Sequence, residues 1–458
     1  MNDSFANTQC CTSKLSLRIQ GPAFLAAMFM VVVAIPLFLT YSTGQVFYKF
    51  SPIDEGPHYD YAQRIFTHGP PVFGDTMLPS SLNDLSCRGI ALNGIVLPPC
   101  GTLPIVAANY PGQGLQYESQ QPPLYYAVSK IGALVGHLVG FTDFKSMRML
   151  SGLMLVAGLL TTLVAGLLLG VARWLLLAAL FAVGTAPSVI YQQTIVSNDA
   201  AGILCGAAVM YLCARVIRGI RVNTSWAVGL GIAAGFTKAT FAIPCVVGAV
   251  VLVVIAVREK RVSRWCEAVK LQQVKVAIGL MAGSALAVIA WTIRVKATSY
   301  ISLSTIPAFD VLRQHPGTIK TIFRESFKAY WPLTDSYTPF NGVDGDLMRA
   351  LANIACFAGI GAMASGAFVS VRTWWSTAGP IALVLQYCGF VLLSIGTWKT
   401  YKIDPGMESR YALSMIPLVV LVLCAGVQRR SGAVIYIAGA LLMGLVFAWH
   451  ILHSSAPT

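Results

Sequence analysis

Residues 22–41 read PAFLAAMFMVVVAIPLFLTY, an unbroken apolar run that is long enough to cross the hydrocarbon layer of a membrane as a helix. Similar runs recur along nearly the whole chain, which is 56% hydrophobic and only 11% charged, with a mean hydropathy of +0.68. This composition excludes a water-soluble globular domain. The runs lack the alternation of barrel strands, and lipid admits only helices or closed barrels. The sequence therefore predicts an all-α protein, a polytopic bundle of membrane-spanning helices.

The first run has the basic flank of a signal peptide, because Lys14 and Arg18 precede it. It is longer than the apolar core of a typical signal peptide and no small-x-small cleavage site follows it, so we interpret it as a retained first span. Residues 146–172 are predicted to form a short in-and-out hairpin, because the basic residues on either side both look cytoplasmic. We expect about 11 to 13 spans in total. The predicted spans outside the hairpin are 22–42, 121–140, 174–191, 198–218, 225–240, 242–257, 276–295, 346–370, 377–396, 411–427 and 431–452.

The net charge of +14 is compatible with nucleic-acid binding, but the positions of the basic residues argue against it. They crowd into short loops, and such loops mark the cytoplasmic side and face anionic lipid. The polar segments 45–120, 296–345 and 397–410 then lie outside. We therefore expect one membrane domain over residues 1–458, with 45–120 and 296–345 as its two long extracytoplasmic loops. The main basic clusters are Arg258, Lys260, Arg261, Arg264, Lys270 and Lys275, and Arg429 with Arg430.

Two of the eleven cysteines, Cys87 and Cys100, lie in the first outer segment, whereas most of the others lie in apolar runs. An oxidising exterior permits a disulfide between them. Connectivity cannot be proved from sequence, so free thiols remain the alternative.

The stretch SPIDEGPHYDYAQRIFTHG, residues 51–69, follows the first span and places two adjacent carboxylates, Asp54 and Glu55, ahead of His58. Pro57 suits the first turn of a helix that ends before Gly69. Apolar and polar side chains alternate at helical spacing, which predicts a short amphipathic juxtamembrane helix on the outer membrane surface. Two like charges held close raise one carboxyl pKa and leave the other ionised, as suits a general base and its partner. The alternative is a solvated pair at the membrane boundary.

Three more polar clusters stand at outer ends of predicted spans. YESQQPPLYYAV (117–128) offers Glu118, Gln120 and Gln121, although an ordinary interfacial helix start explains them as well. TIVSNDAAGIL (194–204) offers Asp199. Ser197 or Asn198 of the same motif is the better candidate for the helix cap. GFTKATFAIP (235–244) places Lys238 within an apolar stretch. A cation there is a candidate functional residue, and the alternative is that its side chain snorkels to the surface.

The last outer segment brings Glu408, Arg410 and Tyr411 to the outer end of a span. An arginine binds phosphate through two parallel hydrogen bonds, and its alternative role is snorkelling at the interface. The sequence contains no Walker loop, no His-Glu-x-x-His and no Cys-x-x-Cys, so no motif indicates nucleotide or zinc binding.

Taken in order, these motifs resemble the GT-C class of membrane glycosyltransferases. The resemblance rests on the acid pair, QPPLYY, SNDA, GFTKAT and SRYAL, and covers roughly residues 22–420. The most similar subgroup is bacterial multi-pass proteins with a Pro-Asp-Glu-x-x-His signature. Protein O-mannosyltransferases and lipid A aminoarabinose transferases are more distant. This chain departs from the signature, with one extra residue between Pro52 and Asp54.

The resemblance implies an integral protein of a bacterial inner membrane whose site faces away from the cytoplasm. A polyprenyl-phosphate-linked sugar would be the donor, and a glycan, lipid or protein the acceptor. Asp54 would act as the base and Glu55 as its partner, with inversion at the sugar, while Arg410, Lys238 and His58 would bind the donor phosphate.

The remaining site residues are expected to bind the acceptor or the sugar, and a divalent cation is an open option. They are Asp199, Glu118, Gln120, Gln121, Tyr411 and Glu408. Two other functions compete with transfer. A transporter or flippase of lipid-linked sugars needs similar cations, but it predicts internal repeats that we do not detect. A non-catalytic envelope scaffold explains the spans but not the acid pair.

Overall fold

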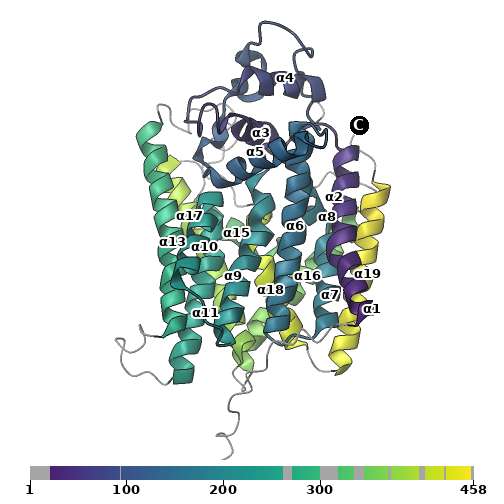
Figure 1. The fold of residues 1–458 in the computed structure, drawn as a ribbon, viewed down its shortest axis with the longest axis vertical. Helices are drawn as coiled ribbons and strands as arrows, with labels where there is room; N and C mark the ends of the chain where they lie inside the picture. The colour runs from purple at the N-terminus through teal and green to yellow at the C-terminus, as the bar shows by residue number, and fades with distance from the viewer. Residues whose placement is uncertain are drawn as a thin grey trace, which may run out of the picture.

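The computed structural model shows a bundle of long helices, roughly aligned, with a cap of short elements at one end (Figure 1). This cap is formed by residues 47–123, and we call that end of the bundle the loop end. Among the described residues no strand forms, and only two isolated bridges, Phe50 to Ile90 and Thr76 to Leu115, link extended segments. The described residues are 21–92, 94–260, 271–299, 318–334, 345–369, 373–401, 408–427 and 430–454.

The helices follow the apolar runs. Those of the first half are α1 (Pro22–Met28), α2 (Ile35–Val46), α3 (Glu55–Arg64), α4 (Pro79–Arg88), α5 (Leu124–His137), α6 (Asp143–Leu168), α7 (Arg173–Thr185), α8 (Pro187–Thr194) and α9 (Gly202–Ile217). Those of the second half are α10 (Thr224–Thr237), α11 (Ala242–Lys260), α13 (Gln272–Thr298), α15 (Ile319–Ser326), α16 (Gly345–Ser365), α17 (Trp374–Tyr401), α18 (Ile416–Gly426) and α19 (Arg430–His453).

Short 3-10 and π-helical turns lie between these helices. They are η1 (Phe29–Ala34), η2 (Ala107–Asn109), η3 (Pro111–Gly114), η4 (Tyr117–Gln120), η5 (Asn198–Ala201), η6 (Ala239–Phe241), η9 (Phe327–Tyr330), η10 (Gly366–Phe368) and η11 (Ser409–Met415). The π-helical η1 joins α1 to α2 just before Pro36, whose missing N–H breaks the regular hydrogen-bond ladder.

Nine of the described helices are long and apolar enough to span a membrane, or up to ten with the bent pair α7 and α8 counted as one span. The all-α membrane bundle is therefore confirmed. The predicted hairpin at 146–172 is wrong, because α6 runs through it as one continuous helix. The predicted spans at 121–140 and 225–240 correspond to α5 and α10, which have only 14 residues each. Of the second outer loop, 296–345, the residues 300–317 and 335–344 lie outside the described residues, as do residues 402–407 of the segment 397–410.

Small residues let some helices approach closely. α10 and α13 meet through glycines, and a Cβ added at Gly231 would lie 2.4 Å from the backbone oxygen of Leu280. A Cβ at Gly283 would lie 2.3 Å from the oxygen of Val228. In lipid, such backbone contact replaces the hydrophobic driving force that packs soluble helices.

The juxtamembrane helix is present as α3, but it does not lie on the membrane surface. Nearly all of its side chains are buried, including those on the expected polar face. Asp60 on that face accepts hydrogen bonds from Leu78 N at 2.7 Å and from Gln116 Nε2 at 2.8 Å. The prediction of a one-sided amphipathic helix is therefore wrong: the rest of the first loop, with α4 above it, covers α3 (Figure 1).

A disulfide joins Cys87 to Cys100 in that loop, with 4.5 Å between the two Cα atoms. We expect both cysteines to resist an impermeant maleimide in the native protein and to react after reduction. Labelling with and without reductant, followed by mass spectrometry, measures this. Labelling of Cys87 and Cys100 before reduction would contradict the bond.

Candidate active site

A polar cluster lies under the first loop, at the loop end of the bundle. It forms where five chain segments break or begin a helix, so that side chains point inward from irregular backbone rather than from a helix face. Membrane proteins tolerate such backbone only where protein covers it or where it lines a cavity. The segments contribute Asp54 before α3, Glu118 in η4, Asp199 in η5, Lys238 between α10 and η6, and Arg410 in η11.

Asp54 occupies a strained position. Its φ of 55° is left-handed, which few residues except Gly, Asn and Asp adopt readily. The carboxylate makes no cap hydrogen bond to its own helix and accepts one from the Tyr117 hydroxyl at 2.8 Å. The side chain is 36% exposed. Asp54 is thus a reachable carboxylate that is held toward the cluster.

Glu55 differs sharply from its neighbour. It is fully buried and forms a two-pronged ion pair with Arg148 of α6, at 2.8 Å from Nε and 2.6 Å from Nη2. It also accepts hydrogen bonds from the backbone N–H groups of Ser51 at 2.7 Å and Val196 at 2.8 Å. The expected catalytic partnership with Asp54 does not fit these contacts, because both carboxylate oxygens are already engaged. Glu55 instead fixes the loop to α6 and to the segment before η5.

Asp199 holds two cations at once. Its Oδ1 lies 2.5 Å from Lys238 Nζ and its Oδ2 lies 3.3 Å from Arg410 Nε. Arg410 also reaches Asp54, with 3.7 Å between Nη2 and Oδ2. Asp199, Lys238 and Arg410 are all buried, so their charges act in a low dielectric and fix one another in place. The arrangement presents two positive groups beside the reachable Asp54.

Tyr411 supports the same cations through its ring. Lys238 Nζ lies 4.2 Å from the ring centroid and the Arg410 guanidinium lies 5.4 Å away. Glu408 precedes η11 as its N-cap residue and is half-buried. Both therefore lie beside the site, as expected from their place in the sequence.

Glu118 and His58 form a second, mostly uncharged part of the cluster. Burial and the nearby Asp54 carboxylate raise the pKa of Glu118 to about 8. Burial, together with the charge of Lys238, lowers the pKa of His58 to about 3. The His58 ring hydrogen-bonds the Tyr126 hydroxyl at 2.7 Å, and its Nε2 lies 3.9 Å from Glu118 Oε2. His58 can therefore offer a phosphate a hydrogen bond but no charge.

The two glutamines have mainly structural contacts. Gln121 Oε1 accepts a hydrogen bond from Asn198 Nδ2 at 2.9 Å, which ties the second motif to η5. The backbone oxygen of Gln120 accepts one from Trp291 Nε1 of α13 at 2.8 Å. Both residues thus lie at the rim of the cluster, where they join its segments.

The donor set does not fit a divalent cation. Among the described residues, no group of three or more His, Cys, Asp or Glu side chains is placed to hold a metal. The two aspartates that would be the natural ligands, Asp54 and Asp199, both pair with Arg410.

The raised pKa of Glu118 predicts a pH-dependent stability. The folded carboxyl keeps its proton up to about pH 8, whereas the unfolded one loses it near the ordinary value of 4.5. The folded state therefore binds more protons between these values and loses stability as the pH rises through them. We expect Glu118→Gln to flatten the fall in melting temperature between pH 5 and about pH 8. An unchanged slope in that variant would mean that another group carries the effect.

Comparison with known proteins places this geometry in a fold. No protein-family model and no curated protein matches the chain. Among solved structures, the oligosaccharyltransferase AglB of Archaeoglobus fulgidus, in complex with an inhibitory peptide and a dolichol-phosphate, is similar with a TM-score of 0.50 and 11% identity. The similarity covers 95% of this chain and 56% of that one. The chain has a GT-C fold.

Two further GT-C structures are similar at lower scores. ArnT of Cupriavidus metallidurans in the apo state has a TM-score of 0.43 and 15% identity, over 89% of this chain and 61% of that one. The apo oligosaccharyltransferase of Archaeoglobus fulgidus has a TM-score of 0.48 and 10% identity, over 96% and 57%. The chain thus spans less than two thirds of the length of these GT-C proteins.

Three residues of this cluster and its surroundings were not singled out from the sequence. Tyr117 and Tyr126 stand in the quoted motif YESQQPPLYYAV, where neither was given a role. Arg148 lay within the segment that was interpreted as a hairpin. The signal for Arg148 was present, because an ionisable residue inside an apolar run calls for a buried partner.

Proposed function

We propose that the protein is a polyprenyl-phosphate-dependent glycosyltransferase that acts on the extracytoplasmic side of the membrane. The observation that carries this proposal is the position of Arg410, which lies between the reachable carboxylate of Asp54 and the buried Asp199. A base and a phosphate-binding cation thus lie side by side, as transfer from a sugar phosphate requires. The GT-C fold supports the same chemistry.

Asp54 removes the proton of the acceptor hydroxyl as that oxygen attacks the anomeric carbon. The bond from this carbon to the phosphate oxygen breaks, the electron pair leaves with polyprenyl phosphate, and the sugar inverts. Arg410 and Lys238 stabilise the negative charge that grows on the departing phosphate. Glu118, with its pKa of about 8, is protonated at neutral pH and can donate a hydrogen bond to the same phosphate instead of repelling it.

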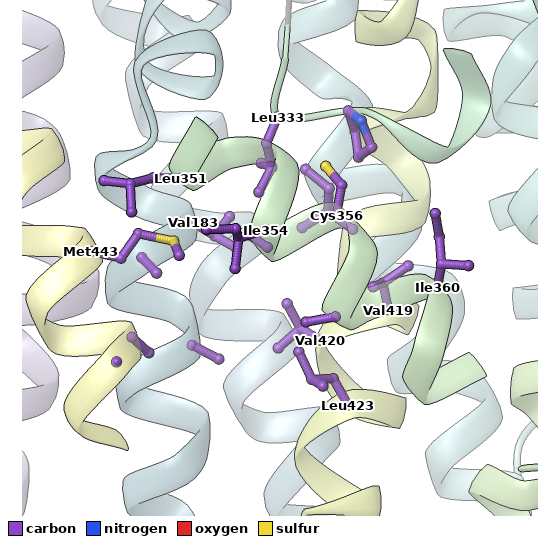
Figure 2. A pocket seen from close by; sticks show the side chains of 18 of the residues that line it. Val183, Leu333, Leu351, Ile354, Cys356, Ile360, Val419, Val420, Leu423 and Met443 are labelled. Carbon is purple, nitrogen blue, oxygen red and sulfur yellow. The ribbon is translucent and has the colours of Figure 1, made fainter. Parts of the chain in front are cut away.

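An apolar cavity of about 550 Å³ supports a lipid-linked donor. It lies between α7, α16, α18 and α19, and Figure 2 shows Ile354, Val419, Val420 and Leu423 lining it. α18 begins directly after η11, which carries Arg410, and its apolar residues continue along the cavity wall. A donor phosphate at Arg410 can thus extend its polyprenyl chain along α18 into an apolar space.

The test uses the purified full chain in lipid nanodiscs with a panel of polyprenyl-phosphoryl sugars and, separately, nucleotide sugars. We expect at least one polyprenyl donor to lose its sugar and release polyprenyl phosphate, with nucleotide sugars inert. Turnover of a nucleotide sugar at the same site would contradict the proposed donor class. Transport of an intact lipid-linked sugar between leaflets, without release, would favour the flippase.

Arg410→Lys should impair donor binding although it keeps the charge. A lysine cannot form two parallel hydrogen bonds to phosphate or reach both aspartates from one planar group. Loss of one charged hydrogen bond corresponds to about a tenfold weaker donor affinity. Titration with a non-transferable donor analogue measures the affinity. Arg218→Lys is the matched control, because Arg218 is an exposed cation at the end of the bundle opposite the loop end. Wild-type affinity in Arg410→Lys and in Arg410→Ala would remove Arg410 from the donor site.

A further inference from the structure

A second cavity lies away from the candidate active site, between α2 and α6 at the loop end. It has a volume of about 230 Å³ and is roofed by the last residue of α4, Arg88. Its floor forms where α2 and α6 touch: a Cβ added at Gly152 would lie 2.9 Å from Thr40 Oγ1. The two helices are thus in contact below the cavity, and Arg88 reaches it from α4, which lies in the cap at the loop end (Figure 1).

The described residues that line this cavity include three cations and no acid. One of them, Arg148, is neutralised by Glu55. The other two contact aromatic rings: Arg88 lies 4.5 Å from the centroid of Phe144, and Lys145 lies 4.4 Å from that of Phe141. In the part of the chain that the structure describes, neither has an ion-pair partner. The cavity therefore carries a net positive charge that nothing described there balances.

The surface below the cavity is apolar and faces outward. On α2, Tyr41 lines the cavity and is 41% exposed, and Phe38, one turn before it, is 58% exposed. On α6, Leu153 is 50% exposed and lies two turns beyond Lys145. The site thus pairs a cationic head at the membrane boundary with an apolar wall beneath it. A phospholipid has the complementary arrangement, with a phosphate headgroup at the membrane boundary and apolar chains beneath it.

We propose that this cavity binds a membrane lipid with a net-negative phosphate headgroup, whose charge pairs with Arg88 and Lys145. The exposed rings of Tyr41 and Tyr48 suit the headgroup level, where amphipathic aromatics concentrate. The acyl chains lie against Phe38 and Leu153. This proposal is independent of glycosyl transfer, because none of these residues belongs to the cluster around Asp54.

The bound lipid also stabilises the neighbouring loop. Arg148, one turn beyond Lys145, lines the cavity and donates to the backbone oxygens of Phe47 at 2.5 Å and Lys49 at 2.9 Å. A headgroup on Lys145 therefore packs beside the residue that anchors the start of the first loop. A ligand that binds only the folded state raises the melting temperature by mass action.

The test adds single lipids to the full chain in mild detergent and follows binding by native mass spectrometry and melting temperature by fluorescence. All variants carry Arg410→Ala, so that lipid phosphate at the candidate active site does not contribute. We expect phosphatidylglycerol to bind more tightly than phosphatidylcholine and to raise the melting temperature. Inorganic phosphate at equal concentration should do neither.

Neutralising the cavity should remove this preference. Arg88→Gln with Lys145→Gln is expected to weaken phosphatidylglycerol binding by about fivefold for each cation removed, the contribution of one Lys or Arg near an anionic membrane surface. Arg218→Gln, an exposed cation at the far end of α9, is the matched control and should leave binding unchanged. Arg88→Lys with Lys145→Arg keeps the charge and should keep the preference.

Any of the following results would overturn the proposal. Equal binding of phosphatidylglycerol by the neutral double variant would show that the lipid lies elsewhere. Equal binding of phosphatidylcholine would show that the headgroup charge is not recognised. Competition by free phosphate at the lipid's own concentration would make this an ion site rather than a lipid site. If the double variant does not fold, the two single variants are measured, and an unchanged preference in both also overturns the proposal.

Discussion

Arg148→Met should lower the free energy of unfolding by about 3 to 5 kcal/mol, the usual cost of leaving one charge of a buried ion pair without its partner. Glu55 would then be a fully buried carboxylate that keeps only backbone donors. Two backbone oxygens of the first loop, those of Phe47 and Lys49, would lose their donor as well. The loop that carries Asp54 would therefore loosen from α6.

Arg88→Met is the matched control for this change. Arg88 and Arg148 stack on the same ring, with their guanidinium carbons 4.5 Å and 4.1 Å from the centroid of Phe144. Only Arg148 also pairs with Glu55. Melting temperatures of the two variants, with size-exclusion profiles to check folding, separate the ion pair from the stacking. Equal losses in both variants would contradict the role assigned to the pair.

The double variant Glu55→Gln with Arg148→Met should recover part of that loss, because it removes both charges instead of stranding one. A loss equal to the sum of the two single losses would show that the pair does not act as a unit. This comparison also separates Glu55 from catalysis. We expect Glu55→Gln alone to lose stability and activity together, whereas a catalytic partner would lose activity with an unchanged melting temperature.

Asp54→Asn should reduce turnover by about 10² or more, the usual scale for loss of a general base. Asparagine keeps the size and can still accept a hydrogen bond from Tyr117, but it takes up no proton. Stability should change by less than about 0.5 kcal/mol, because the side chain is partly exposed and caps no helix. Steady-state transfer rate and melting temperature are measured together.

Asp84→Asn is the control for this variant. Asp84 lies in the same loop, on α4, and accepts a hydrogen bond from the Tyr59 hydroxyl at 2.7 Å, outside the cluster. Its turnover should stay close to that of wild type, because Asp84 lies outside the cluster around Arg410. Normal turnover in Asp54→Asn would instead assign the base elsewhere, and Glu118 would be the next carboxyl to test.

The apolar runs were sufficient to predict a helical membrane bundle, because the lipid imposes the same length and composition on every span. The positions of Asp54, Asp199, Lys238 and Arg410 were also predicted to converge, and the structure brings the four together. Each stands at the outer end of a predicted span, so that one topology places all of them at one end.

The sequence did not reveal contacts between segments that lie far apart in the chain. Asp54 and Glu55 look equivalent as adjacent acids, but the left-handed backbone at Asp54 turns one carboxylate toward Arg410 and the other toward Arg148. The surface position of α3 was wrong for a similar reason. Its polar face is covered by Gln116 and by the segment before α4, which are distant in sequence.

The most direct test of the account is a single-turnover measurement with donor already bound. Wild-type and Asp54→Asn protein are loaded with the same polyprenyl-phosphoryl sugar, bound donor is quantified, and acceptor is then added while released polyprenyl phosphate is followed. The account predicts equal donor occupancy and a release rate at least about 10² lower in Asp54→Asn. Release at the wild-type rate from equally loaded Asp54→Asn protein would contradict it.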